Sequence, residues 1–145
     1  LAELHGGREA CAEKLLKSFS MERTYEVGSY GGVIHEMTEM AAVPFGQYAH
    51  SNQPVHHHLA LLARLGRRDE AKALAHRVLR DLYDPETGFC GDEDNGEMAC
   101  WYLLTALGVY PLCPGDPRFE TFRPLFARAE IDLPAGTLTI EPGDG

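Results

Sequence analysis

The stretch GDEDNGEMACWYLLTALGVY, residues 91–110, joins a run of acidic residues to a long apolar segment. Its first part carries three carboxylates and one amide in four consecutive positions, 92–95. Apolar residues then dominate from 96 to 109, a composition typical of a helix that is buried on nearly all sides. The stretch therefore predicts a deeply buried helix that begins at a carboxylate-rich loop.

The rest of the chain reads as further helices joined by alternately short and long loops. Hydrophobic periodicity predicts helices over residues 8–19, 33–42, 56–65 and 67–83. Short segments at 129–133 and 137–141 predict two strands on either side of a Pro-Ala-Gly turn. This order predicts a mainly α fold of the toroid or solenoid kind with a short C-terminal β segment, and no fixed-period repeat selects between the two kinds.

The composition limits the classes of function. The 145 residues are 44% hydrophobic and 24% charged, as in a globular domain. The net charge of −9 argues against nucleic acid and anionic membranes as partners, because both bind basic surfaces, and it suits a cation or a neutral sugar. The sequence contains no run of ~20 apolar residues, so it predicts no membrane-spanning helix. The four cysteines form no CxxC pair, so we expect free thiols and no zinc site.

Asp92 and Asp94 are the first candidates for chemistry. In an extended loop these alternate carboxylates can point the same way and hold a hard cation, or one of them can act as a general base on water. The alternative is that Asp and Asn in positions 92–95 cap the following helix and complement its dipole. An EF-hand calcium loop is excluded by spacing, because Gly96 falls at its fifth position and Leu103 at its twelfth.

His35 and Glu36 form a second candidate pair. Adjacent donor and acceptor groups suit the vicinal hydroxyls of a sugar, and the alternative is a surface pair at the start of a helix. The pair does not belong to a zinc-protease HExxH motif, because Glu39 stands where that motif needs its second histidine.

The segment GQYAHSNQPVHHH, residues 46–58, holds a third set of polar side chains. Asn52 and Gln53 offer amide oxygens, which are calcium-type ligands, although Asn52 is also a common turn residue. The three consecutive histidines at 56–58 cannot all face one metal from a helix, because neighbouring side chains diverge by about 100°.

The chain resembles glycoside hydrolase family 92 in two segments, GQYAHSNQPVHH (46–57) and LYDPETGFCGDEDNGEMACWYLLTALGVYPLCPGDP (82–117). Its opening, LAELHGGREACAEKLLKSF (1–19), is similar to a Gly-Gly-containing helix of the same family. Members of the family are calcium-dependent, inverting exo-α-mannosidases, many of them specific for α-1,2 linkages. The resemblance implies hydrolysis of terminal α-linked mannose from an oligosaccharide or N-glycan, with Ca²⁺ as cofactor.

The resemblance also implies a role for each candidate residue. Asp92 and Asp94 match the positions from which the family draws its general base, and Asp94 is the first choice because it opens the D-x-G step before the apolar helix. Substrate binding is implied for His35, Glu36, Asn52, His56 and His57, with the His-Glu pair on the leaving mannose. Calcium binding is implied for Asn52, Gln53 and Asp94. The family's general acid is a glutamate upstream of the Gly-Gly helix, outside this sequence.

The same resemblance divides the chain into two parts. Residues 1–128 are expected to form the C-terminal helical hairpins of an (α/α)6 toroid, and 129–145 a short β segment that returns toward a β-sandwich domain absent from the chain. The remaining part of the parent polypeptide is then a partner of this chain. Members of the family are often secreted or periplasmic.

Some positions depart from the family pattern. Ser51 stands where Gly is frequent and Val55 where Ser is, while Asn95 and Glu97 replace the common Cys and Gln. Ser51 and Asn95 lie closest to the expected site, so the departures concern fine specificity more than reaction type.

Two other classes of function remain open on the sequence. A non-catalytic calcium- or carbohydrate-binding helical module would keep the loops and lack the acid. A TPR-like scaffold is suggested by the helical pair over 62–83, but it leaves the acidic loop and the histidine-rich segment without a role.

Overall fold

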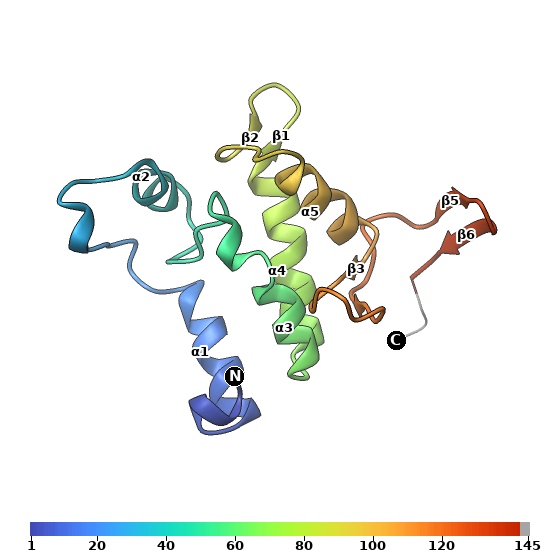
Figure 1. Ribbon diagram of the computed structural model, residues 1–145, viewed down its shortest axis with the longest axis horizontal. Coiled ribbons are helices and arrows are strands. Elements are labelled where there is room, and N and C mark those ends of the chain that lie inside the picture. The colour runs from blue at the N-terminus through green and yellow to red at the C-terminus, as the bar shows by residue number, and fades with distance from the viewer. Residues whose placement is uncertain (143–145) are drawn as a thin grey trace.

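The fold is organised around a helical hairpin. Helices α3 (His58–Arg64) and α4 (Arg68–Asp81) pack against each other and are joined by a tight turn at Gly66. Helix α1 (Arg8–Ser18) packs against α3, and α5 (Glu97–Ala106) packs against α4 (Figure 1). The structure, a computed structural model, describes residues 1–142.

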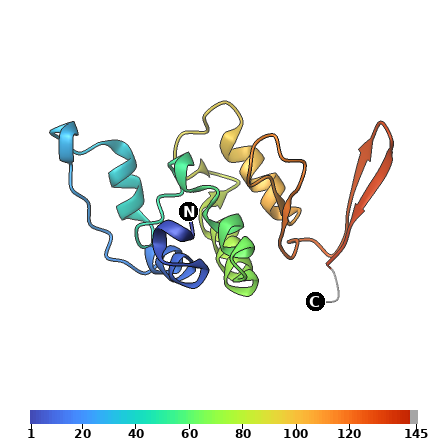
Figure 2. The same cartoon turned by 60° about the horizontal axis from the view of Figure 1, so that its bottom comes forward.

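The other elements are short and lie at the margins of this hairpin. Helix α2 (His35–Ala42) lies at one end of the molecule and the β5–β6 hairpin at the other (Figures 1 and 2). Three antiparallel strand pairs occur in the described part of the chain: β1 (Tyr83–Asp84) with β2 (Gly88–Phe89), β3 (Val109–Tyr110) with β4 (Glu120–Thr121), and β5 (Ala129–Leu133) with β6 (Gly136–Ile140). Single 3-10 turns are η1 (Glu3–His5), η2 (Gly28–Tyr30) and η3 (Gln53–Val55).

The core lies where α1, α3, α4 and α5 meet. Helix α4 buries Ala71, Ala75, Val78 and Leu79, which lie on one face because of their helical spacing. Trp101 of α5 is 2% exposed and belongs to the core. The helices and the C-terminal strands predicted from periodicity are therefore present, with ends that shift by a few residues.

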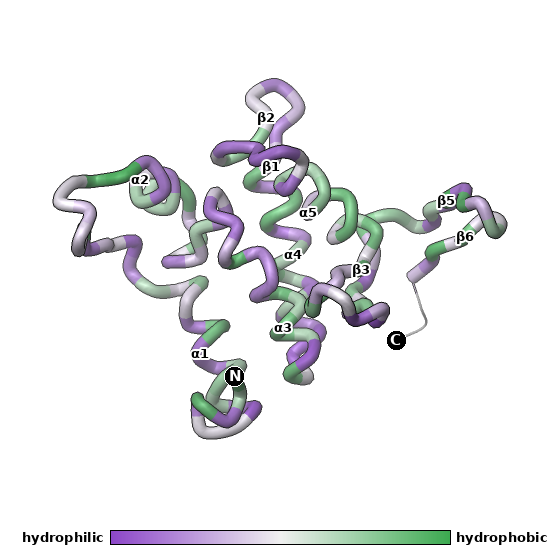
Figure 3. Tube along the Cα trace, in the orientation of Figure 1, coloured by the Kyte–Doolittle hydropathy of each residue, from purple (hydrophilic) through white to green (hydrophobic). Residues whose placement is uncertain are grey.

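The prediction that the helix after the acidic loop is deeply buried on nearly all sides is wrong. Met98 and Trp101 of α5 are buried, whereas Leu103 is 59% exposed. Apolar residues run along the whole helix (Figure 3), but only one face of α5 meets α4 within residues 1–142. Composition reports how apolar a helix is, and the neighbouring elements decide which face is covered.

The described residues form an array of five α-helices with small antiparallel strand pairs, and the closed toroid stays a prediction. The β5–β6 hairpin stands away from the helices (Figure 2), and the division at residue 128 stays a prediction. The last three residues of the predicted segment 129–145 lie outside the described part of the chain. No helix of the described part is long and apolar enough to cross a membrane. All four cysteines are free, as predicted.

Candidate functional site

Three segments that are far apart in sequence meet above the core. They are the start of α2, the loop at residues 50–57 and the acidic loop at residues 91–96, and the last two are hydrophilic and adjacent (Figure 3). Gln53 Nε2 donates a hydrogen bond to Asp94 Oδ2, and His35 Nε2 lies 3.6 Å from Asp92 Oδ2. The structure thus brings together the acidic loop, the amide-bearing loop and the His-Glu pair that the sequence singled out.

Gly91 allows the closest approach between two of these segments. A Cβ at this position would lie 2.6 Å from Ser51 Cβ and 3.1 Å from Glu39 Oε2, so any side chain would collide with the neighbouring loop. Sequence reasoning did not identify Gly91, because a glycine in a loop does not show what its backbone approaches. This contact fixes where the acidic loop begins.

The backbone of the acidic loop turns through three consecutive residues with positive φ. The φ angles are 53° at Asp94, 58° at Asn95 and 98° at Gly96. Asp and Asn are the non-glycine side chains that tolerate this region best, and a strained backbone at an exposed acid is a mark of functional loops. The turn leaves the Asp94 carboxylate in contact with Gln53.

Glu93 caps the helix that follows. Its carboxylate accepts hydrogen bonds from the backbone N–H of Gly96 at 2.6 Å and of Ala99 at 3.1 Å. The capping alternative was offered for Asp and Asn, but the side chain that bonds the start of α5 is that of Glu93. Asp92 and Asp94 are exposed and make no such bond. The sequence analysis did not identify Glu93 as a helix cap, although its position three residues before Gly96 could have indicated this role.

His35 lies between two carboxylates. Its Nδ1 is 3.5 Å from Glu36 Oε2 and its Nε2 is 3.6 Å from Asp92 Oδ2. Both distances exceed a normal hydrogen bond, and His35 is 61% exposed, so these polar side chains form a loose cluster near the surface. The His35 ring and the Asp92 carboxylate are open to solvent and can reach a polar ligand.

Three oxygen atoms around the site are buried without a hydrogen-bond partner among the described residues: Glu36 Oε2, Glu39 Oε2 and Ser51 Oγ. Unpaired buried polar atoms are rare in folded proteins, because their desolvation is not offset. Carboxylate and hydroxyl oxygens of this kind are donors that suit a hard cation such as Ca²⁺. Within residues 1–142 no group of three or more His, Cys, Asp or Glu side chains is arranged around one metal position, so amide or hydroxyl donors are needed for such a site.

A buried network supports the site from below. His50 Nδ1 accepts a hydrogen bond from Tyr48 Oη at 3.0 Å, its Nε2 donates to Tyr83 Oη at 2.7 Å, and Tyr83 Oη donates to the carbonyl oxygen of Met98 at 3.3 Å. Burial first, and then the neighbouring charge of His56, hold the pKa of His50 well below its usual range. A neutral His50 fits this one-directional chain, which links the loop at 50–57 to the start of α5.

The two histidines implied for substrate binding lie in different surroundings. His56 is 2% exposed and engages the backbone oxygen of His50 and the side chain of Glu97, so its ring lies beneath the site. His57 is exposed and lines a separate cavity beside His5 and Cys11. Asn52 is half-buried and directly precedes Gln53. The assigned roles of these three residues stay predictions.

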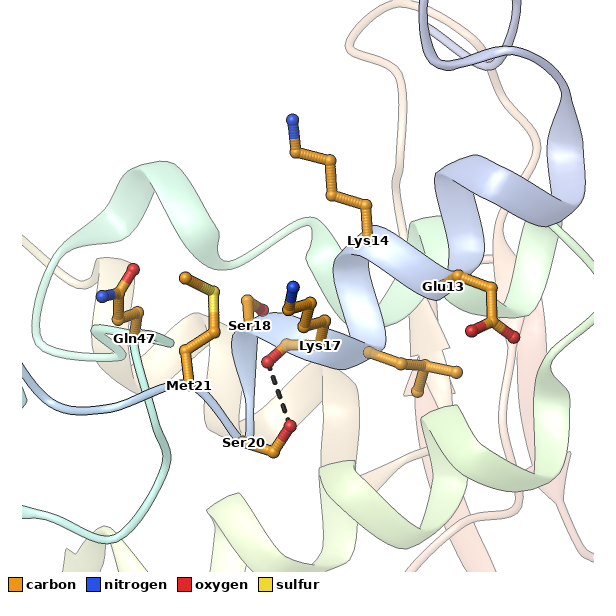
Figure 4. A pocket seen from close by; sticks show the side chains of 8 residues that line it. Glu13, Lys14, Lys17, Ser18, Ser20, Met21 and Gln47 are labelled. Atoms are coloured by element: carbon orange, nitrogen blue, oxygen red, sulfur yellow. Dashed lines mark hydrogen bonds between the residues drawn. The ribbon is translucent and has the colours of Figure 1, made fainter.

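A larger surface cavity runs along α1 and lies apart from the acidic loop. Figure 4 shows Lys14, Lys17, Met21 and Gln47 on its walls, with Ser20 Oγ donating to the carbonyl oxygen of Lys17 at 3.2 Å. Its charged groups are two lysines and one glutamate, so it lacks the paired carboxylates that acid–base chemistry needs.

Comparison with known proteins gives consistent similarities. A family model described as the glycosyl hydrolase family 92 catalytic domain matches residues 1–144. Among solved structures, the chain is similar to the family GH92 inverting mannosidase BT2199 from Bacteroides thetaiotaomicron VPI-5482, with 40% identity and a TM-score of 0.75 over 99% of this chain and 20% of that chain. A search of curated proteins gave no match.

The fold also resembles the family GH92 α-mannosidase BT3965 from Bacteroides thetaiotaomicron, alone and in complex with mannoimidazole. Both comparisons give 21% identity over 92% of this chain, with TM-scores of 0.71 and 0.74 over 16% and 17% of the other chains. The chain therefore spans 16–20% of the length of these three solved structures.

Proposed function

The chain belongs to glycosyl hydrolase family 92, and on this premise we propose that it forms the general-base side of an exo-acting α-mannosidase. The observation that carries the proposal is the acidic loop, where Glu93 caps α5 while Asp92 and Asp94 stay exposed beside His35 and Gln53. The 40% identity to an inverting mannosidase supports the reaction class.

Asp94 is the proposed base. Its Oδ2 accepts a hydrogen bond from Gln53, which orients the carboxylate and leaves Oδ1 for an attacking water molecule. Inversion requires a general acid on the opposite side of the sugar ring, with the two carboxyl groups about 6.5–9.5 Å apart. We assign that acid to a glutamate outside these 145 residues, and we place this chain within an (α/α)6 toroid.

His35 and Glu36 are the proposed contacts of the leaving sugar. Glu36 is 30% exposed on its side chain and His35 is 61% exposed, so both can reach a ligand in solution while they remain near Asp92. A donor and an acceptor side by side suit the hydroxyls of the second mannose, which supports a preference for α-1,2-linked substrates such as those on N-glycans.

Calcium is the proposed cofactor. Asn52, Gln53 and Asp94 would hold the ion, and the unpaired oxygens of Glu39 and Ser51 support the presence of a cation nearby. When bound, calcium supplies a positive charge that favours sugar hydroxyl binding and ring distortion. Asn52 and Gln53 would then orient the ion relative to Asp94 through their loop.

The test uses the full-length protein and α-1,2-mannobiose, with the released anomer followed by proton NMR. We expect initial release of β-mannose, loss of release in EDTA, and recovery when calcium is added. Initial release of α-mannose would exclude inversion, and unchanged release in EDTA would exclude the calcium requirement.

Binding without turnover would favour the other class of function, a calcium- or carbohydrate-binding module. Calorimetry of sugar binding on the same sample distinguishes the mannosidase from the binding module. Binding of α-1,2-mannobiose with no mannose release from any α-mannobioside would contradict the mannosidase proposal.

A further inference from the structure

Helix α2 carries the His35–Glu36 pair at its start, yet the helix contributes little to the core. It has eight residues, too few to be stable as an isolated helix in water, so tertiary contacts must hold it in place. Within α2, which lies wholly in the described part of the chain, Met40 is the only buried side chain. The helix lies at one end of the molecule, away from the α3–α4 hairpin (Figures 1 and 2). What fixes α2 therefore also fixes the two proposed contacts of the leaving sugar.

The segment that contains α2 is closed at its base by Gly46 and Gln47. The backbone N–H of Gln47 donates a hydrogen bond to the carbonyl oxygen of Ser18 at 2.7 Å, at the end of α1. Gly46 has a φ of 63°, and a Cβ at this position would collide with the same oxygen atom, so only glycine allows the approach. Residues 19–45 thus leave the helical body and return to it at one point.

The side chain of Gln47 holds the first part of this segment. Its Nε2 donates hydrogen bonds to the carbonyl oxygens of Glu22 at 3.1 Å and of Thr24 at 3.2 Å. A carbonyl oxygen can only accept a hydrogen bond, so the amide uses its two N–H groups, one for each carbonyl. The two accepting residues lie on either side of Arg23, and the clamp therefore fixes the backbone of this arginine.

Arg23 connects the clamp to α2. Its Nη1 donates a hydrogen bond at 2.9 Å to the carbonyl oxygen of Ala41, one of the last four carbonyls of the helix. These carbonyls have no partner within a helix, and a cation at this end also complements the helix dipole. At 1.5 Å per residue the helix is about 12 Å long, so a shift at Ala41 is carried through the helix to His35 at its other end.

We propose that Gln47 and Arg23 are positioning residues: they hold α2 so that the His35–Glu36 pair can contact the leaving sugar. The role in sugar recognition rests on the proposed function, whereas the attachment of α2 does not. The acidic loop is held separately, because the Glu93 carboxylate binds the start of α5. Loss of the clamp should therefore weaken binding of the leaving sugar and spare the chemical step.

The first experiment compares two substrates in the full-length protein. α-1,2-Mannobiose has a second sugar, whereas the leaving group of α-mannosyl fluoride is a single fluorine atom that cannot report on leaving-sugar contacts. Gln47→Glu keeps the shape of the side chain, but a carboxylate cannot donate to the two carbonyl oxygens and is repelled by them. We expect the KM for mannobiose to rise about five- to tenfold at unchanged kcat, with kcat/KM for the fluoride nearly unchanged. An equal change with both substrates, or no change with either, would overturn the role in sugar recognition.

Arg23 supplies a second variant that alters no buried side chain, because Arg23 is exposed. Arg23→Ala removes the contact with Ala41, and we expect the same rise in KM, with partial recovery in Arg23→Lys, which keeps a positive charge and a donor. Arg80→Ala is the matched control, because Arg80 is also exposed and pairs, among the described residues, only with the neighbouring Asp81. A mannobiose KM in Arg23→Ala equal to that in Arg80→Ala would overturn the role of Arg23.

The second experiment follows α2 itself by amide hydrogen exchange of residues 37–42 in the same full-length samples, and it needs no turnover. We expect exchange in α2 to rise about tenfold in Gln47→Glu and in Arg23→Ala, while exchange in α4 stays at the wild-type rate. Wild-type exchange of α2 in both variants would overturn the attachment. Failure of the wild type to release mannose from either substrate would count against the proposed function, and the exchange result would still decide the attachment.

Discussion

Asp94 has a backbone conformation with positive φ, which few residue types other than glycine adopt. Asp94 has a φ of 53° and contacts Gln53, whereas the two carboxylate oxygens of Glu93, one residue earlier, accept hydrogen bonds from the N–H groups of Gly96 and Ala99. Neighbouring acids in one short loop thus have different tasks, because the direction of each side chain follows from its own backbone angles. Asp92 lies on the side of His35 and is 76% exposed.

Replacement of Asp94 tests the base assignment. We expect Asp94→Asn to lower kcat by about 10²- to 10⁴-fold, the usual contribution of general-base catalysis, because the amide cannot accept the proton of water. Asp92→Asn should have a smaller effect, since Asp92 assists. The measurement is turnover of α-1,2-mannobiose by the full-length protein, with Glu86→Gln as a control for charge. Wild-type turnover in Asp94→Asn would remove the assignment.

Replacement of Gly91 tests the close approach of the loops. Gly91→Ala places a methyl group 2.6 Å from Ser51 Cβ, and overpacking of this kind costs about 1–3 kcal/mol. We expect a lower urea midpoint together with weaker substrate binding. Gly32→Ala is the matched control, because a Cβ there meets nothing within 4 Å and its φ is not in the positive range. Equal midpoints for both variants would show that the loops can separate freely.

At the scale of elements, helix α5 connects the core to the site. Its buried face supplies Met98 and Trp101 to the core, and its first turn contacts the acidic loop through Glu93 and the histidine-rich loop through Glu97. One rigid helix therefore positions two loops that are about 40 residues apart in sequence. This arrangement gives the site a rigid support although its residues lie on loops.

Replacement of Glu93 tests the cap. Glu93→Ala leaves the N–H groups of Gly96 and Ala99 without their carboxylate, and we expect a loss of about 1 kcal/mol in the free energy of unfolding. Urea unfolding measures this loss. Glu93→Gln retains one acceptor oxygen and should lie between the alanine variant and the wild type. A midpoint for Glu93→Ala equal to that of the exposed control Glu86→Ala would contradict the capping role.

At the scale of the whole molecule, the core of the described chain covers only part of the apolar surface. Large apolar side chains remain exposed on several elements: Leu4, Leu103, Phe119, Leu125, Phe126, Leu133 and Leu138. The chain corresponds to about a fifth of the length of BT2199. These exposed faces fit the proposal that the remaining part of the parent polypeptide packs on them.

The buried histidines predict how stability depends on pH. Burial lowers the pKa of His58 from 6.5 to about 4, with His57 adding to the shift, and burial lowers the pKa of His50 as well. Between about pH 4 and 6.5 the unfolded chain binds more protons than the folded chain, so stability falls as the pH decreases through this window. The pKa values of Asp81 and Asp84 are lowered from 3.8, so these two carboxyl groups affect stability only at pH values below this window.

Urea unfolding of the chain at several pH values checks this dependence. We expect a lower midpoint at pH 5 than at pH 7.5, and a smaller difference in His58→Gln, which cannot take up the proton. An identical midpoint at the two pH values, or an undiminished difference in His58→Gln, would show that burial of these rings does not control the acid stability.

Local patterns predicted much of this protein. The spacing of apolar residues identified the helices and the C-terminal hairpin, and the order of the residues in the two long segments indicated the family. The same patterns identified His35, Gln53 and Asp94 as candidates, because chemistry needs particular side chains and the sequence displays them directly. These features depend on residues that are near one another along the chain.

Tertiary structure alone decided which of these residues meet. It paired Gln53 with Asp94 and His56 with Glu97, each across 41 positions, and it required Gly91 for the contact with Ser51. It also exposed one face of α5 that composition had suggested would be buried. The physical reason is that periodicity encodes which face of an element is apolar, whereas contacts between distant loops depend on how the helices beneath them pack.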